Sequence, residues 1–222
     1  MLWPWKPRPR ADPVRYRPFG ATGKAVSAVS LLLRDLARGM DDPLFVRTDR
    51  SIRAALGDDL YGIDGETLAS SVGRLLQERG LVLGIAESCT GGLLSSTVTG
   101  VAGSSGWFAG GIVAYANGVK ESLLGVEAEL LARCGAVSGE TARAMAAGAA
   151  ARLGCDLAVA VTGIAGPGGG TTEKPVGTVH IGLHQSGRTS DQRFRFSGTR
   201  RQVQEKTTHM ALDMVRRAVL AG

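Results

Sequence analysis

Cysteine is scarce in this chain, and long hydrophobic runs are absent. Only Cys89, Cys134 and Cys155 occur in 222 residues, which is too few and too scattered for a disulfide framework or a zinc site. No stretch approaches the roughly 20 apolar residues that a membrane-spanning helix needs. We therefore expect a protein of the reducing cytoplasm, with no metal, no cofactor and no contact with a membrane.

The beginning of the chain lacks the apolar core of a secretory signal and carries most of the excess charge. Residues 1–50 hold ten Lys/Arg and five Asp/Glu, so they contribute +5 of the formal net charge of +6. Four prolines among the first thirteen residues exclude a helix there. The remainder is nearly neutral, so the high isoelectric point does not by itself indicate nucleic-acid binding.

Three segments can be distinguished along the chain. Residues 1–50 are predicted to be a basic N-terminal extension, partly disordered, with one helix over residues 25–40. Residues 51–63 form a linker, and residues 64–222 form the main domain. That domain alternates short apolar strands (81–86, 111–114, 157–161) with amphipathic helices and ends in an antiparallel strand pair and a long helix. This order predicts an α/β fold, a three-layer α/β/α sandwich with a mixed β-sheet.

Two polar, glycine-rich loops follow two of the predicted core strands. The first reads Ala-Glu-Ser-Cys-Thr-Gly-Gly over residues 86–92, and the second spans residues 161–170. A strand–loop–helix junction offers unpaired N–H groups and the positive end of a helix to an anion. Two such loops after buried strands predict one ligand site at the edge of one sheet.

The residues that could carry out chemistry are Ser105, Tyr115 and Lys120. A serine becomes a good nucleophile when a base removes its proton, and a lysine whose pKa is lowered by burial can be that base. A tyrosine hydroxyl can relay the proton or stabilise an oxyanion. From spacing alone this signal is weak, and a surface lysine with a half-buried tyrosine is the simpler interpretation.

Two other groups of residues suggest different chemistry. Cys89, beside Glu87 and with Lys120 as partner, could form a thiol amidase site, although a small buried cysteine is the simpler interpretation. His180 and His184 share a strand face but lack a third ligand, so a metal site is not expected.

The segment from residue 64 onward resembles the C-terminal domain of the competence-damage-inducible protein A (CinA) family, which is a nicotinamide-nucleotide amidohydrolase. The resemblance rests on six sequence blocks in the family's order, at residues 86–92, 103–111, 115–120, 136–142, 161–169 and 174–179. The larger N-terminal domain of the family, of the molybdopterin-binding type, does not match this chain.

The resemblance implies that the chain hydrolyses nicotinamide mononucleotide to nicotinate mononucleotide and ammonia, in pyridine nucleotide recycling. It implies Ser105 as nucleophile, Lys120 as its base and Tyr115 as an assisting group. Substrate would be bound by residues of the two loops and of the last helix, namely Ser88, Thr90, Gly91, Thr162, Gly163, Gly166 and Arg200. We also expect a homo-oligomer, most simply a dimer.

The match departs from the family near the last helix. The resemblance leads us to expect Gly-Asp-Arg followed one turn later by another arginine, but this chain has Thr199 before Arg200 and has Gln204 one turn on. A nucleotide-binding module with weakened catalysis is therefore the alternative hypothesis. A nucleic-acid adaptor that uses the basic extension is a third, and the nearly neutral main domain argues against it.

Overall fold

The computed structural model describes residues 47, 50–51, 54–57, 61–62 and 66–222. The chain divides into two compact units, Met1–Thr67 and Leu68–Gly222, and we describe the second. The helix predicted over residues 25–40 and nearly all of the predicted basic extension lie outside the described residues, as do residues 52–53, 58–60 and 63 of the predicted linker.

The second unit contains five strands and six α-helices, with one short 3-10 helix. The strands are β1 (Leu83–Glu87), β2 (Phe108–Val113), β3 (Leu157–Gly163), β4 (Thr178–Gln185) and β5 (Arg188–Arg195). The helices are α3 (Leu68–Arg79), α4 (Leu93–Thr99), η2 (Ser104–Gly106), α5 (Asn117–Leu124), α6 (Ala128–Cys134), α7 (Gly139–Leu153) and α8 (Arg200–Ala221). The α-helices described in this unit therefore number six from α3 to α8, and η2 is additional.

The five strands form one mixed sheet in the order β2-β1-β3-β4-β5. Strand β1 pairs in parallel with β2 on one side and with β3 on the other, while β4 and β5 run antiparallel. Glu87, the last residue of β1, is in register with Val113 of β2 and Val161 of β3. The loops that leave these three strands therefore emerge at the same edge of the sheet.

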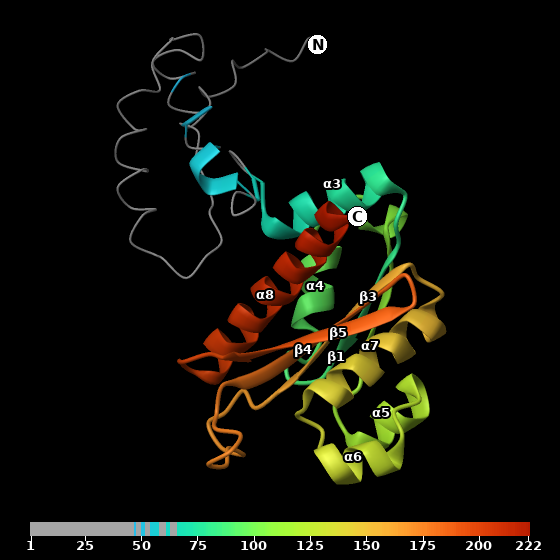
Figure 1. Cartoon of the computed structure of the whole chain (residues 1–222), viewed down its shortest axis with the longest axis vertical. Coiled ribbons are helices and arrows are strands. Elements are labelled where there is room, and N and C mark those ends of the chain that lie inside the picture. Colours follow the sequence, from blue (N-terminus) through green and yellow to red (C-terminus); the bar gives the residue numbers. More distant parts are fainter. Residues whose placement is uncertain (1–46, 48–49, 52–53, 58–60, 63–65) are drawn as a thin grey trace, which may run out of the picture. The chain divides into compact units, whose positions relative to one another are not determined.

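Helices cover both faces of the sheet (Figure 1), which confirms the predicted α/β class with a mixed sheet. Helix α7 packs on β1, β3, β4 and β5 and carries α5 and α6 on its outer side. Helices α4 and α8 pack on the opposite face, and α3 packs against α8. The arrangement follows from chain order, because crossover helices between parallel strands must lie on a face of the sheet.

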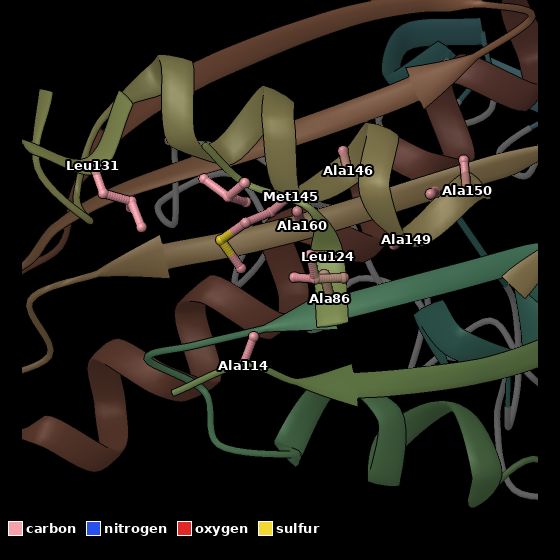
Figure 2. Packing of buried hydrophobic residues seen from close by; sticks show 11 residues of the cluster. Ala86, Ala114, Leu124, Leu131, Met145, Ala146, Ala149, Ala150 and Ala160 are labelled. Atoms are coloured by element: carbon pink, nitrogen blue, oxygen red, sulfur yellow. The ribbon is translucent and has the colours of Figure 1, made fainter. Parts of the chain in front are cut away.

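Small side chains bring α7 close to the sheet. Ala146, Ala149 and Ala150 of α7 pack with Ala86 of β1 and Ala160 of β3, together with larger residues of α5 and α6 (Figure 2). A Cβ atom at position 148 would overlap the carbonyl group of Leu124, so the helix needs glycine there. This close packing fixes α5, the helix that carries Lys120, against the sheet.

The predicted helices and strands are present with shifted ends, but the first part of β5 and the 3-10 helix η2 were not predicted. Strand β2 begins at Phe108 rather than at residue 111, and β5 begins at Arg188 rather than at residue 193. Strand β5 reads Arg-Thr-Ser-Asp-Gln-Arg-Phe-Arg and lies at the edge of the sheet, where exposed polar side chains remove the apolar signal. The 3-10 helix over Ser104–Gly106 was not predicted. In the described part of the chain, no helix is both long and apolar enough to cross a membrane.

Candidate active site

A buried lysine contacts a serine at the edge of the sheet. The Nζ atom of Lys120 in α5 donates a hydrogen bond to Oγ of Ser88 at 3.2 Å. Lys120 is 1% exposed and Ser88 is 9% exposed. Ser88 directly follows β1, and its backbone N–H donates to the carbonyl of Val161 in β3. The serine is thus held between the two parallel strands, and the lysine reaches it from the α7 side of the sheet.

Two backbone carbonyls orient the amine of Lys120. Nζ donates to the carbonyl oxygens of Ala114 and Tyr115, each at 2.9 Å. A neutral amine has two N–H groups and one lone pair. If both N–H groups are directed to these carbonyls, the lone pair faces the third neighbour, the hydroxyl of Ser88. Burial lowers the pKa of Lys120, which favours the neutral amine that this arrangement needs.

The hydroxyl of Tyr115 accepts a hydrogen bond from Arg200, the first residue of α8. One N–H of the Arg200 guanidinium donates to Oη of Tyr115 at 3.0 Å, and another donates to the carbonyl of Gly166 at 2.9 Å. Since the arginine occupies an acceptor position of the phenol, the tyrosine proton is free to point elsewhere. A guanidinium has five N–H donors, so Arg200 keeps donors for a ligand. These two contacts connect the start of α8 with the loops that follow β2 and β3.

Ser105, the predicted nucleophile, is not part of this arrangement within one chain. It lies exposed in η2, which precedes β2, whereas Tyr115 and Lys120 follow that strand. Six strand residues at about 3.3 Å each separate the two ends by about 20 Å. A base must lie within hydrogen-bond reach of its nucleophile, so the single chain does not bring Ser105 to Lys120, and the role of Ser105 as nucleophile stays a prediction. Ser88, predicted as a substrate-binding residue, is the serine that the lysine contacts.

The start of α4 is already occupied by a carboxylate of the chain itself. The side chain of Glu87 accepts hydrogen bonds from the N–H groups of Gly92, Leu94 and Ser95, and from the hydroxyl of Ser95. These N–H groups are thus already paired within the protein, and the geometry gives no support to the prediction that this helix end binds a substrate anion. Glu87 is fully buried, and its charge is compensated by these donors and by the positive end of the helix. An acidic residue at the end of a buried strand, just before a helix, is the signal that sequence reasoning missed.

The other predicted substrate-binding residues lie around Ser88 in different roles. Thr162 is buried within β3, and its hydroxyl donates to the carbonyl of Ala136 at 2.7 Å. Gly163 ends β3, where a side chain would collide with Val179 and the carbonyl of Thr178. Thr90 is 3% exposed, and its hydroxyl has no hydrogen-bond partner among the described residues. Gly91 has a positive φ of 62°, so it allows the turn that follows Ser88.

Cys89 is poorly suited to be a nucleophile. Its side chain is buried, and burial raises the pKa of the thiol to about 12. Almost none of it is thiolate at neutral pH, and the thiolate is the reactive form. Its supposed partner Glu87 is committed to α4. The thiol amidase interpretation has no support from this geometry.

One more residue of α8 contacts the loop after β1. Gln204 of α8 donates through Nε2 to the carbonyl of Cys89 at 2.9 Å, a contact that sequence reasoning did not foresee.

Away from these loops, His180 lies 3.6 Å from the carboxylate of Asp191, and burial lowers the pKa of this histidine. Across the residues that the structure describes, no three His, Cys, Asp or Glu side chains gather as a possible metal site.

Comparison with known proteins identifies the family. The family model CinA C-terminal domain matches residues 65–219. A CinA-like protein of Desulfotalea psychrophila is 45% identical over 192 residues, which cover 86% of this chain and 46% of that protein. A putative competence-damage inducible protein of Symbiobacterium thermophilum is 52% identical over 181 residues, covering 78% and 42%. The chain thus spans less than half the length of these relatives.

Solved structures agree with this match. The competence/damage inducible protein CihA of Agrobacterium tumefaciens has a TM-score of 0.66 and 43% identity, covering 68% of this chain and 93% of that one. A CinA superfamily protein of Klebsiella pneumoniae has a TM-score of 0.68 and 34% identity, covering 70% and 97%. Through its residues 65–219, the chain belongs to the CinA family.

Proposed function

We propose that this chain is an amidohydrolase that converts nicotinamide mononucleotide to nicotinate mononucleotide and ammonia. The contact between Nζ of Lys120 and Oγ of Ser88, with both carbonyl partners of the lysine behind it, is the observation that carries the proposal. It is the arrangement of a serine nucleophile with a neutral lysine as its base. The substrate is inferred from the resemblance to the nicotinamide-nucleotide amidohydrolase domain.

In the first half of the reaction, Oγ of Ser88 attacks the carboxamide carbon while its proton passes to Nζ of Lys120. The carbonyl oxygen becomes an oxyanion. Return of the proton to the amide nitrogen, directly or through the Tyr115 hydroxyl, breaks the C–N bond and releases ammonia. An ester between Ser88 and the nicotinate group remains. Water then attacks the ester while Lys120 takes one of its protons and returns it to Oγ of Ser88, which leaves as the free serine. The nicotinic acid group that forms loses its remaining proton to solvent and becomes the carboxylate product.

The oxyanion requires N–H donors near Ser88, and the loop after β1 offers two. The backbone N–H groups of Cys89 and Thr90 donate to no carbonyl or carboxylate oxygen among the described residues. They follow the proposed nucleophile directly, a common source of oxyanion donors in serine hydrolases. The phosphate of the nucleotide would be bound by the remaining N–H groups of Arg200 rather than by the start of α4.

The test is ammonia release from nicotinamide mononucleotide, nicotinamide riboside and nicotinamide by the full chain. Turnover of the mononucleotide at a far higher kcat/KM than the other two is expected. Binding of the mononucleotide without ammonia release would instead support the nucleotide-binding module, since Gln204 replaces an expected arginine. If the chain neither binds the mononucleotide nor releases ammonia from it, both assignments are refuted.

A further inference from the structure

The peptide bond between Cys89 and Thr90 is anchored from outside its own loop. Gln204 lies one helical turn beyond Arg200 in α8, and its side-chain amide donates to the carbonyl of Cys89 at 2.9 Å. The two residues are 115 positions apart in the chain. Closing a contact over so long a stretch of chain costs conformational entropy.

Nearly all other backbone groups of the loop are paired within the sheet, the loop or α4. The Gly91 N–H donates to the Ser88 carbonyl, and the Leu93 N–H donates to the Thr90 carbonyl. The N–H groups of Gly92, Leu94 and Ser95 donate to Glu87. Among the described residues, the peptide group between Cys89 and Thr90 receives one hydrogen bond, which Gln204 donates to the Cys89 carbonyl.

That peptide is the central one of a tight turn. The bond from the Gly91 N–H to the Ser88 carbonyl closes a four-residue turn whose middle residues are Cys89 and Thr90. Rotation of this central peptide by about 180° would give the other common turn type, which needs a positive φ at Thr90 and is disfavoured for a β-branched residue. Thr90 does not have a positive φ here, so the turn and the contact with Gln204 favour the same orientation. Rotation would exchange the directions of the Cys89 carbonyl and the Thr90 N–H.

In a trans peptide, the carbonyl and the following N–H point in opposite directions. The cis peptide bond of the described residues is at Gly166–Pro167, so the Cys89–Thr90 bond is trans. When Gln204 holds the carbonyl toward α8, the Thr90 N–H is directed away from α8. We infer that Gln204 is a positioning residue that fixes the Thr90 N–H as a donor to the oxyanion formed at Ser88. The catalytic part of this inference rests on the proposed function.

Gln204 is also one of the residues at which this chain departs from the family pattern. The resemblance led us to expect an arginine at position 204, and glutamine retains an N–H donor there. The site can then remain active despite the change. A variant that keeps the shape of the side chain but removes the N–H donor should lose the hydrogen bond to the Cys89 carbonyl.

Gln204→Glu is that variant, since a carboxylate is nearly isosteric but repels the Cys89 carbonyl. The matched control is Glu205→Gln, the next residue of α8, whose partner Arg201 is on the protein surface. Removing an oxyanion donor outright costs about 10²–10³-fold in kcat. For a displaced donor we expect a smaller loss, of about 10–100-fold in kcat, with KM changed less than about threefold. Glu205→Gln should leave both constants unchanged.

A second measurement is independent of turnover. The backbone amide resonance of Thr90, followed by NMR in the full chain, should shift or broaden in Gln204→Glu and remain in place in Glu205→Gln. An unchanged Thr90 resonance would overturn the positioning role. A changed resonance with unchanged kcat would overturn the catalytic role, as would a loss of thermal stability alone. If the unmodified protein releases no ammonia, the proposed function and the oxyanion role both fail, and the Thr90 resonance still decides whether Gln204 fixes the peptide.

Discussion

Lys120 and Ser88 are 32 positions apart in the sequence, yet both are buried and their Nζ and Oγ atoms lie 3.2 Å apart. The contact arises because β1 and β2 are parallel neighbours and α5 folds back over the end of β2. Because Lys120 contacts Ser88 and not Ser105, substitutions of the two serines should have different effects on activity.

Ser88→Ala should lower kcat/KM on nicotinamide mononucleotide by about 10⁴-fold or more, because loss of a covalent nucleophile removes most of the rate enhancement. Ser105→Ala, at the opposite end of β2, should stay within about twofold of the unmodified protein. Ammonia release measures both, and circular dichroism checks that both variants are folded.

Cys89→Ala serves as the second control, since the thiol adjoins Ser88 in the chain. It should retain turnover. Loss of activity in Cys89→Ala or Ser105→Ala, with activity kept in Ser88→Ala, would move the nucleophile away from the proposed position.

The pH dependence follows from the lowered pKa of Lys120. The neutral amine is the base, so kcat/KM should rise with pH and level off above this pKa, at a lower pH than an ordinary lysine near 10.5 would require. Lys120→Arg keeps a positive charge but does not deprotonate in this range. It should therefore be inactive at every pH. A profile that is flat from mildly acidic to alkaline pH would contradict lysine as the base.

Arg200→Ala should lower kcat/KM for two reasons that can be separated. Loss of the bond to Tyr115 should affect nicotinamide mononucleotide and nicotinamide riboside alike. Loss of the phosphate contact should affect only the mononucleotide, by about 10–150-fold for a charge-assisted bond of about 1.5–3 kcal/mol. The ratio of the two rates reports the phosphate contact.

The control is Arg201→Ala, because Arg201 pairs with Glu205 on the surface of the same helix. It should leave the ratio unchanged. If Arg200→Ala slows both substrates equally, Arg200 holds Tyr115 and does not bind the phosphate.

Glu87→Gln should destabilise the fold. The substitution removes the buried charge that accepts three backbone N–H groups and the Ser95 hydroxyl. Leaving a buried donor poorly paired costs about 1–3 kcal/mol in the free energy of unfolding. Urea denaturation measures this loss. Glu121→Gln, an exposed residue of α5, should change stability by less than about 0.5 kcal/mol. Equal stability of the two variants would show that the capping of α4 is unimportant.

The sequence predicted the edge of the sheet at which the site lies, because two apolar strands each end in a glycine-rich polar loop. Periodicity also located α7 and α8 to within a residue or two. The pairing of Lys120 could not be predicted in the same way. Ser105 is closer to Lys120 along the chain, but a strand between them carries it to the far edge, and spacing does not reveal which end of the strand a residue occupies.

The roles of Glu87 and Gln204 were missed for related reasons. Glu87 was considered only as a partner for Cys89, although its position before α4 allowed a capping role. Gln204 was recognised as a departure from the family, but its contact with Cys89 requires α8 to pack beside the loop after β1. Such long-range contacts depend on the assembled sheet, so local patterns do not encode them.

The two residues that α8 contributes have a consequence for biosynthesis. Arg200 reaches a tyrosine 85 positions earlier in the chain, and Gln204 reaches a carbonyl 115 positions earlier. A ribosome that has completed Ser88, Tyr115 and Lys120 has therefore not yet supplied the groups that orient them. Chains that end before about residue 200 should therefore contain the serine and the lysine but lack both orienting contacts from α8.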